Sequence, residues 1–292
     1  MESVTVRVPA TTANLACGFD TLGCALSLYN TLRFTLSDKL GFSGCDEEFQ
    51  NEDNLAWQAF RAVYAHLGRP VPAVRIDISA DIPVSRGLGS SAAMLAAGAV
   101  AANALSGAEL SGAELLAVVT PIEGHPDNLA PALFGGLVAS LYCGGKAYCS
   151  SLPVNPALHF IILSPDYTLS TQAARAALPE NLPFTDAVYE LPRLALLPKA
   201  LAEGDEELLS ICLSDRLHQP WRSPLIPGME DVRSAAAALG CHAFCISGAG
   251  SSLLCISRDP SFAGKLSCAV SSLPHSWVVR ELCVDPAGAV II

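Results

Sequence analysis

The chain has 292 residues, enough for one large domain or two ordinary ones; 51% of them are hydrophobic and 15% are charged. This composition is typical of a globular protein, and polar interruptions leave no run of about 18 apolar residues, which argues against a membrane-spanning helix. The formal net charge of −11 argues against general nucleic-acid binding, although one local basic or dipolar pocket could still hold a nucleotide.

The eleven cysteines are spread through apolar runs without paired metal-ligand spacing, and we interpret them as free thiols that are mostly buried. Residues 1–7 lack a basic segment followed by an apolar core, and they predict the start of a first strand rather than a signal peptide. Free thiols without a secretory signal predict a reducing, cytoplasmic compartment.

Hydrophobic periodicity places the elements of the N-terminal half. Strands are predicted at residues 4–8, 28–36, 74–79 and 137–142, with a small, glycine-punctuated segment over residues 10–23 and a polar surface loop over residues 38–53. One helical face covers residues 54–67, and an alanine-rich run predicts a buried helix over residues 92–105. Ser111 precedes Glu114 by three residues, which is capping-box spacing and predicts a further helix from Ser111 to about residue 119.

A glycine- and serine-rich turn connects strand 74–79 to the alanine-rich helix. Gly87 and Gly89 permit a positive φ and the close approach of a ligand, while Ser90 and Ser91 lie where a first helical turn leaves N–H groups unpaired. These donors and the helix dipole favour an anion, and the hydroxyls could cap the helix, bind phosphate oxygen or ligate magnesium. Taken alone, the stretch is explained as well by a turn whose serine caps a core helix.

Two other segments combine polar side chains with glycine or proline. Asn14 and Asp20 are the main polar residues of segment 10–23, where they could shape a turn or face a polar or cationic ligand group. Residues 122–136 gather acid, imidazole and amide groups, namely Glu123, His125, Asp127 and Asn128. This segment could be a polar turn that caps the next helix, or a ligand-facing loop in which Glu123 binds a hard cation.

The C-terminal half follows a proline-rich crossing at residues 152–156. Strands at 159–163, 242–246, 253–256 and 277–282 are predicted together with helices at 169–179, 186–201, 205–214, 230–239 and 260–273. Thr171 and Arg175 are four residues apart and share a helical face. Arg222 lies in a predicted loop, where an arginine is commonly solvated, and a hairpin would explain the glycines at 247–252 without any function.

In chain order, the three glycine-rich segments near residues 14, 88 and 249 resemble the GHMP kinase superfamily, which is named after galactokinase, homoserine kinase and mevalonate kinase. The central Pro-x-x-x-Gly-Leu-Gly-Ser-Ser-Ala motif is complete at residues 83–92. Within the superfamily, segments 9–20, 124–131, 170–175 and 220–228 resemble the homoserine kinase family. Ser251 departs from the usual proline of the third motif, so we expect that loop to be somewhat more mobile.

The resemblance implies an α+β, two-domain GHMP kinase fold. Residues 1–152 would form an N-terminal domain like domain 2 of ribosomal protein S5, carrying the phosphate loop, and residues 153–292 a ferredoxin-like C-terminal domain. The implied reaction is ATP-dependent phosphorylation of the side-chain hydroxyl of L-homoserine to O-phospho-L-homoserine, a step of threonine biosynthesis, with magnesium as cofactor. The implied partners are ATP and L-homoserine, with no nucleic acid or membrane, and a homodimer is the family expectation.

The resemblance also implies roles for individual residues. The ATP phosphates would bind to Pro83, Val84, Ser85, Arg86, Gly87, Leu88, Gly89, Ser90, Ser91, Ala92 and Ala93. The substrate would contact Asn14, Asp20, His125, Asn128, Thr171, Arg175 and Arg222, with Asp20 and Asn14 at the ammonium and hydroxyl end and the two arginines on the carboxylate. Magnesium would bind to Glu123 and to Ser91 or Ser90.

Asn14, Thr171 and Arg175 would be the catalytic residues. A threonine hydroxyl is a poor base near neutral pH, so we hypothesise direct attack by a positioned substrate hydroxyl, whose proton passes to phosphate or water. Two other functions stay open: another small-molecule kinase of the superfamily, such as a mevalonate-type kinase, or a non-catalytic nucleotide-binding module of the same fold. A Rossmann dehydrogenase is disfavoured, because Ala92 occupies the place of the third glycine.

Overall fold

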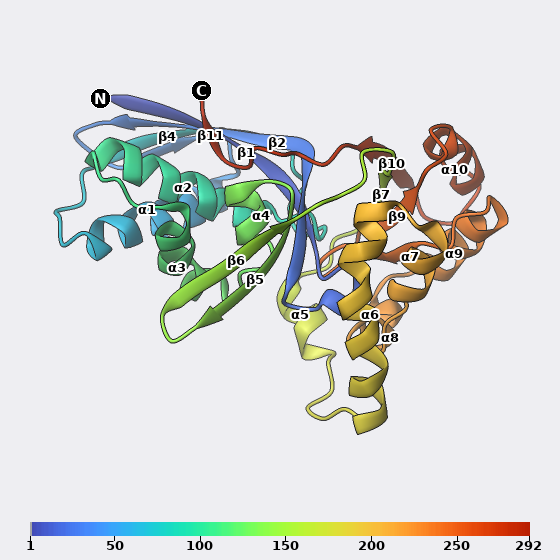
Figure 1. The fold of residues 1–292 in the computed structure, drawn as a ribbon. Coiled ribbons are helices and arrows are strands. Elements are labelled where there is room, and N and C mark those ends of the chain that lie inside the picture. The colour runs from blue at the N-terminus through green and yellow to red at the C-terminus, as the bar shows by residue number, and fades with distance from the viewer. Residues whose placement is uncertain (1) are drawn as a thin grey trace.

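The structure is a computed structural model that describes residues 2–292 (Figure 1). Its larger sheet contains β1 (Ser3–Ala13), β2 (Leu22–Leu36), β3 (Gly41–Ser43), β4 (Val74–Ala80), β5 (Leu137–Cys143), β6 (Lys146–Leu152) and β11 (Val290–Ile291). The strand order is β11-β1-β2-β4-β3, and β5 pairs with both β2 and β6. The N-terminal end of β2 pairs with β5 and its C-terminal end with β4, so this long strand spans both parts of the sheet.

Four helices pack against this sheet on one side (Figure 1). They are α1 (Leu55–His66), α2 (Ser90–Ser106), α3 (Gly112–Glu123) and α4 (Leu129–Phe134). α2 is buried on several faces, and most of its buried residues are alanines. These small side chains allow α1 to approach closely: a Cβ at Gly98 would lie 2.0 Å from the Ala56 carbonyl oxygen. This packing fixes the position of α2 and of its N-terminus.

The smaller sheet contains β7 (His159–Pro165), β8 (Phe244–Ile246), β9 (Leu253–Ser257) and β10 (Trp277–Leu282). Its order, β10-β7-β9-β8, with antiparallel pairing throughout, is the order of a ferredoxin-like sheet. Its helices are α5 (Thr171–Ala176), α6 (Phe184–Glu203), α7 (Glu206–Cys212), α8 (Gln219–Arg222), α9 (Met229–Ala238) and α10 (Phe262–Val270). Short 3-10 turns occupy η1 (Ala16–Gly18), η2 (Glu47–Phe49) and η3 (Ser223–Leu225).

One hydrophobic core runs from the larger sheet into one face of the smaller sheet. Phe160, Ile162 and Leu254 join this core, whereas Ile161 and Leu163 face a second cluster that packs under α9 and α10. Because both faces of β7 and β9 are buried, these strands are nearly continuous hydrophobic runs in the sequence. Among residues 2–292, the structure contains no helix that is both long and apolar enough to span a membrane.

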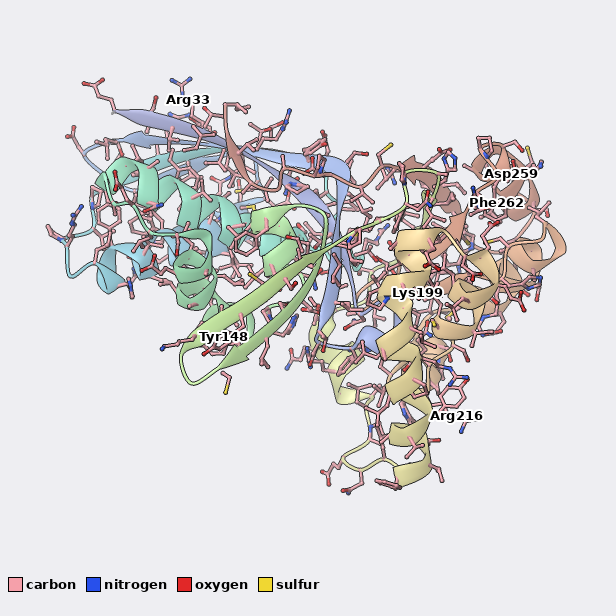
Figure 2. All side chains as sticks on the ribbon, in the orientation of Figure 1. Arg33, Tyr148, Lys199, Arg216, Asp259 and Phe262 are labelled. Carbon is pink, nitrogen blue, oxygen red and sulfur yellow. The ribbon has the colours of Figure 1, made fainter. Side chains whose placement is uncertain are left out.

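The predicted elements are present, with several differences, among them the short strands β3, inside the predicted loop at residues 38–53, and β11, which was not predicted. Segment 10–23 was expected to be a loop, but much of it extends β1 and β2, which pair along most of their length. The edge strand β6 was missed because its residues are mostly exposed and show no alternation; Tyr148 projects from it (Figure 2). Ser111 forms the expected capping box at the start of α3. Arg222 ends α8 and is 1% exposed, so the expectation of a solvated loop residue was wrong.

Glu190 on α6 is an isolated buried carboxylate, 4% exposed. Its Oε1 accepts a hydrogen bond of 2.6 Å from the backbone N–H of Arg216, a residue that Figure 2 labels beside α6, while its Oε2 has no partner among the described residues. Burial raises the pKa of Glu190 from 4.5 to about 7. The folded protein therefore holds this proton over a pH range in which the unfolded chain has released it.

A folded-state pKa above the unfolded value means that the contribution of Glu190 to stability is fully present below about pH 4.5 and is lost as the pH rises through about 7. Glu190→Gln keeps the acceptor for Arg216 and removes the charge. We expect it to raise the free energy of unfolding at pH 8 by on the order of 1–3 kcal/mol and to change it little at pH 5. Urea denaturation at both pH values measures this, and equal stabilities at pH 8 would contradict it.

Candidate active site

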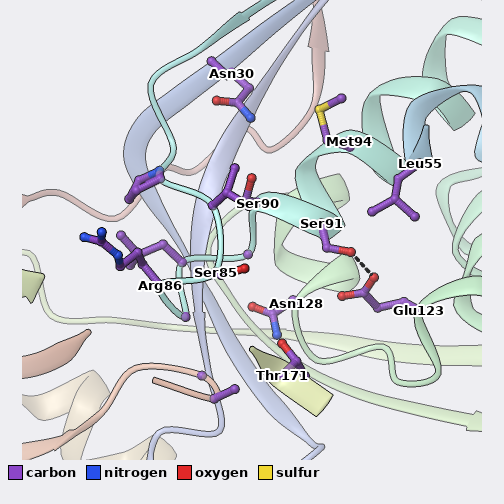
Figure 3. A pocket seen from close by; sticks show the side chains of 18 of the residues that line it. Asn30, Leu55, Ser85, Arg86, Ser90, Ser91, Met94, Glu123, Asn128 and Thr171 are labelled. Atoms are coloured by element: carbon purple, nitrogen blue, oxygen red, sulfur yellow. Dashed lines mark hydrogen bonds between the residues drawn. The ribbon is translucent and has the colours of Figure 1, made fainter. Parts of the chain in front are cut away.

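A cavity of about 410 Å³ opens beside the N-terminus of α2 (Figure 3). One end of its wall is formed by the turn after β1, the loop at residues 83–91, the loop at residues 123–128, the helices α5 and α8, and the loop after β8. All seven residues predicted to contact the substrate line this cavity, as do residues 83–91. Ala92 and Ala93 do not line it, because both are buried inside α2.

The N-terminus of α2 has no side-chain cap among the described residues. Gly89 is its N-cap, with a left-handed φ of 67°. The alternative explanation of the motif, a serine that caps the helix, is therefore wrong. The hydroxyl of Ser91 instead donates a 2.5 Å hydrogen bond to Oε2 of Glu123, and the first-turn N–H groups stay available for an anion.

The three glycine-rich segments are in direct backbone contact. The hydroxyl of Ser247 donates to the Gly87 carbonyl oxygen at 2.7 Å, and a Cβ at Gly87 would lie 2.2 Å from the Ser247 carbonyl oxygen. The Thr11 N–H donates to the Leu88 carbonyl oxygen at 3.1 Å, and a Cβ at Gly89 would lie 1.9 Å from Oγ1 of Thr11. Glycine is therefore required at both positions by neighbouring atoms as well as by φ.

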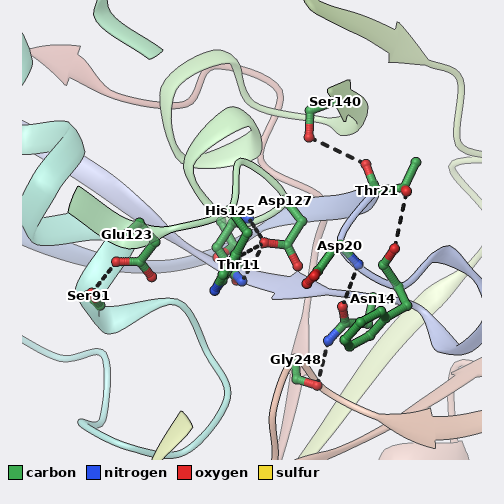
Figure 4. Close-up of polar contacts among 12 residues, drawn as sticks. Thr11, Asn14, Asp20, Thr21, Ser91, Glu123, His125, Asp127, Ser140 and Gly248 are labelled. Carbon is green, nitrogen blue, oxygen red and sulfur yellow. Dashed lines mark hydrogen bonds and ion pairs between the residues drawn. The ribbon is translucent and has the colours of Figure 1, made fainter. Parts of the chain in front are cut away.

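Asn14 connects the first segment to the third (Figure 4). Its Nδ2 donates to the Gly248 carbonyl oxygen at 2.7 Å, and its Oδ1 accepts from the Asp20 N–H at 3.0 Å. Asn14, Leu15 and Ala16 all have positive φ values, 69°, 42° and 58°. Such a run is costly for residues other than glycine, and the contacts of the Asn14 amide help to hold it. Both ends of this amide are therefore already engaged within the protein.

Ser251 stands where the family motif usually has proline. It is fully buried, and its hydroxyl donates to the Tyr167 carbonyl oxygen at 3.0 Å. The expected mobility of this loop stays a prediction, but the structure supplies a restraint that a proline side chain could not make.

Asp20 and Arg175 form a two-bond ion pair at the cavity wall. The Arg175 guanidinium donates to the two Asp20 carboxylate oxygens at 2.6 and 3.2 Å. Burial alone would lower the pKa of Arg175, but Asp20 more than offsets this and raises it. The two residues come from the turn after η1 and from α5, so their meeting depends on tertiary structure. A carboxylate and a guanidinium thus lie side by side, facing the loop at residues 83–91.

Arg222 is a buried cation that stacks, like Arg175, on the ring of Phe19, with its guanidinium carbon 5.2 Å from the ring centroid. It donates to the carbonyl oxygens of Ala174 and Gly248 at 3.3 and 3.2 Å. Burial, together with the nearby Arg175 charge, lowers the pKa of Arg222 to about 10, which leaves it charged near neutral pH. It provides a fixed positive charge behind the cavity wall.

His218 supports Arg222 from behind. Burial lowers the pKa of His218 to about 4, against the opposing effect of Asp215, so the imidazole is neutral near neutral pH. Its Nε2 lies 3.1 Å from the Ala16 carbonyl oxygen and its Nδ1 lies 3.3 Å from Nη1 of Arg222. A proton on Nε2 satisfies both contacts, because Nδ1 then accepts from the guanidinium.

The loop at residues 123–128 presents its acids and imidazole to the cavity. His125 Nδ1 is hydrogen-bonded to Asp127 Oδ1, and ligand atoms of Asp20, His125 and Asp127 lie within 4.8 Å of one another (Figure 4). Burial alone would lower the pKa of His125, but the Asp127 carboxylate outweighs it and raises that pKa. Asn128 Oδ1 accepts from the Thr11 hydroxyl at 2.7 Å. Asn128 is the N-cap of α4 and makes no side-chain cap hydrogen bond among the described residues, whereas Asp127 Oδ1 accepts from the Asn128 backbone N–H at 3.0 Å.

Thr171 is the first residue of α5, beside the side chain of Asn128 (Figure 3). Ser170 caps this helix by accepting from the Ala173 N–H at 3.1 Å, which leaves the Thr171 hydroxyl at the cavity wall. The other end of the cavity was not predicted from the sequence. Its lining residues are Asn30, Cys45, Phe49, Asp53, Asn54, Leu55, Ile78, Ala80 and Met94. They come from separate elements and share no local motif, so pattern reasoning could not assemble them.

The fold and this site match one class of protein. The sequence fits the family profile "GHMP kinases N terminal domain" over residues 54–136 and "GHMP kinases C terminal" over residues 198–275. The predicted α+β GHMP kinase fold is therefore confirmed. The chain is also 42% identical to a homoserine kinase of Clostridium beijerinckii over 99% of its own length and 98% of that protein, and 42% identical to one of Moorella thermoacetica over 98% and 99%. The chain belongs to the homoserine kinase family of GHMP kinases.

Solved structures agree with this assignment. The crystal structure of homoserine kinase from Cytophaga hutchinsonii superposes with a TM-score of 0.90 at 30% identity, covering 100% of this chain and 98% of that one. A mevalonate kinase of L. major, solved in complex with R-mevalonate, superposes with a TM-score of 0.73 at 14% identity, covering 96% of this chain and 95% of that one, which supports the shared fold alone.

The close backbone contact at Gly87 can be tested by adding one methyl group. Gly87→Ala should destabilise the protein by more than about 2 kcal/mol and weaken ATP binding more than about tenfold, because the Cβ would overlap the Ser247 carbonyl oxygen. Gly107→Ala is the matched control: Gly107 ends the same helix with φ +66°, but nothing lies within 4 Å of its Cβ position. It should cost only about 1 kcal/mol. Thermal unfolding and ATP calorimetry measure both, and equal losses would contradict the contact argument.

Proposed function

We propose that this chain transfers the γ-phosphoryl group of ATP to the side-chain hydroxyl of L-homoserine, giving O-phospho-L-homoserine for threonine biosynthesis. The observation that carries this proposal is the Asp20–Arg175 pair in the same cavity as the phosphate loop. An α-amino acid carries its ammonium and carboxylate on one carbon atom, so its receptor needs a carboxylate and a guanidinium side by side. The names of the relatives support the same acceptor.

In this proposal the ATP phosphates bind to the loop at residues 83–91 and to the free N–H groups of α2. The apolar end of the cavity, where Leu55, Ile78 and Met94 meet, receives the nucleotide base. The Arg86 side chain stabilises the loop and does not bind phosphate in this proposal, since its Nη1 donates to the Pro165 carbonyl oxygen. The phosphate loop is thereby tied to the end of β7.

Magnesium fits the chemistry of Ser91 and Glu123. Hydroxyl and carboxylate oxygens suit this hard cation, and the two side chains already meet at 2.5 Å. Burial raises the pKa of Glu123, although the Ser91 hydrogen bond and the His125 charge oppose this. When bound, magnesium would neutralise phosphate charge during transfer.

The chain positions the two substrates for direct transfer. The homoserine hydroxyl oxygen attacks the γ-phosphorus, an O–P bond forms, the bond from phosphorus to the β–γ bridging oxygen breaks, and the hydroxyl proton passes to a phosphate oxygen or water. Thr171, at the start of α5, and Asn128, at the start of α4, orient the hydroxyl, because both line the cavity beside the phosphate loop. Asp20 holds the ammonium, and Arg175 with Arg222 attracts the carboxylate. Asn14 acts by holding Asp20, given its backbone contacts.

Three further features belong to this proposal. The phosphate-loop domain covers residues 1–152 and the ferredoxin-like domain residues 153–292, although β11 returns to pair with β1. A cytoplasmic setting suits the eleven cysteines, which are free throughout the described chain. The homodimer expected of the family would be seen as a doubled mass in light scattering.

An acceptor panel tests the function. ADP release is measured with L-homoserine, L-serine, L-threonine and mevalonate, each with and without magnesium. We expect magnesium-dependent turnover that prefers homoserine, because serine is one methylene too short to bring its hydroxyl to the phosphate and mevalonate has no ammonium for Asp20. Preference for mevalonate would overturn the acceptor, and ATP binding without turnover of any acceptor would favour a non-catalytic module.

The carboxylate clamp predicts a selective effect of Arg175→Lys. Lysine keeps the positive charge but loses the paired donors, so we expect the KM for homoserine to rise about 10- to 100-fold while the KM for ATP changes less than about twofold. Arg61→Lys is the control, since Arg61 pairs with Glu52 at 3.2 Å on the surface. Steady-state kinetics with each substrate varied measures this. Equal changes in both KM values would assign Arg175 to another role.

A further inference from the structure

One buried amide at the apolar end of the cavity has an unused donor. Asn30 lies on β2 and is 0% exposed. Its Oδ1 accepts from the Ile82 backbone N–H at 3.0 Å, whereas its Nδ2 has no hydrogen-bond partner among the described residues. A buried N–H without a partner costs free energy, and native proteins rarely retain one without a reason.

The orientation of this amide is fixed by its neighbour. If the amide were flipped, its NH₂ group would face the Ile82 N–H, and two donors would oppose each other. Nδ2 must therefore be the atom that faces away from Ile82. Figure 3 shows that the Asn30 amide nitrogen points toward the space between Ser90 and Met94, which is part of the cavity.

The surroundings of Asn30 indicate the kind of group that it can bind. Leu55, Ile78 and Met94 form apolar walls at this end, which suits the faces of a flat heteroaromatic ring. The other carboxamide there, Asn54, uses its Oδ1 to accept from the Ala56 N–H and its Nδ2 to donate to the Phe49 carbonyl oxygen. Asn54 thus serves the start of α1, and Asn30 offers a donor to a ligand.

We propose that Asn30 is a specificity-determining residue that donates a hydrogen bond from Nδ2 to a ring nitrogen of the purine base of ATP. The inference deepens the proposed function and rests on its ATP site. An apolar pocket selects flat rings in general, whereas a fixed donor selects a base with an acceptor at one position. Asn30 would thereby orient the base, and through it the triphosphate, relative to the N-terminus of α2.

The test pairs protein variants with base analogues. ATP, 1-deaza-ATP, 3-deaza-ATP and 7-deaza-ATP, each with magnesium and without an acceptor, are titrated into the protein by calorimetry. Wild type should lose about tenfold in affinity for one of the three analogues, and Asn30→Ala should lose about tenfold for ATP. The Asn30→Ala variant should bind that same analogue less than about twofold more weakly than it binds ATP, because the contact is already absent.

Two further variants separate this contact from a structural role. Asn30→Asp keeps the acceptor for Ile82 but replaces the donor, so at pH 8.5 it should weaken ATP binding at least as much as Asn30→Ala while leaving the KM for homoserine within about twofold. Asn103→Ala is the control, since Asn103 bonds to the Leu110 backbone at the other end of α2. It should leave ATP affinity unchanged.

The outcomes discriminate between the claims. Coupling between Asn30 and one deaza position supports the inference. Wild-type affinity for all three analogues equal to that for ATP overturns it, as does an equal loss of affinity for the sensitive analogue in wild type and in Asn30→Ala. ATP binding with this coupling but without homoserine turnover overturns the acceptor and leaves the base contact standing, whereas no ATP binding at all overturns both.

Discussion

The site depends on an uncapped helix N-terminus that is held in place by backbone packing. The first turn of α2 has no side-chain cap among the described residues, and the turn before it reaches the Ser247 carbonyl oxygen so closely that Gly87 has no room for a Cβ. Available N–H donors are useful for phosphate only if the loop around them cannot collapse onto them. The contact with the loop after β8 holds the turn in place.

The same contact joins the two halves of the protein. Ser247 and Gly248 lie in the loop between β8 and β9 of the smaller sheet, yet they bond to the loop at residues 83–91 and to the end of β1. Gly248 also accepts from Asn14 and Arg222, so one carbonyl oxygen connects the phosphate side of the cavity with its charged side. A change in this loop should therefore affect ATP and homoserine together. Arg175, by contrast, pairs with Asp20 at the wall, which explains why we expect its substitution to act on one substrate.

Burial determines how each charged group behaves at the end of the cavity where Asp20, Arg175 and Arg222 meet. Arg175 is exposed enough to exchange its partner, and its carboxylate neighbour keeps it charged. Arg222 is buried without a bound carboxylate; burial lowers its pKa to about 10, but not far enough to discharge it near neutral pH. The neutral His218 behind it adds an acceptor and no charge. In the proposed function, this positive charge attracts the substrate carboxylate.

The sequence by itself determined the class of fold and the glycine-rich turn before α2, because local motifs record backbone requirements such as the positive φ of Gly87 and Gly89. The seven residues predicted at the substrate line one cavity, and their contacts with a substrate stay a prediction. It could not place the exposed edge strand β6, the burial of Arg222 or the pairing of Asp20 with Arg175, since residues 155 positions apart meet only when the two sheets pack. The apolar end of the cavity, including the unpartnered donor of Asn30, was likewise decided by tertiary structure. Its residues come from four separate segments of the chain. They were identified by their burial and by an unpartnered hydrogen-bond donor, and neither property can be read from the sequence.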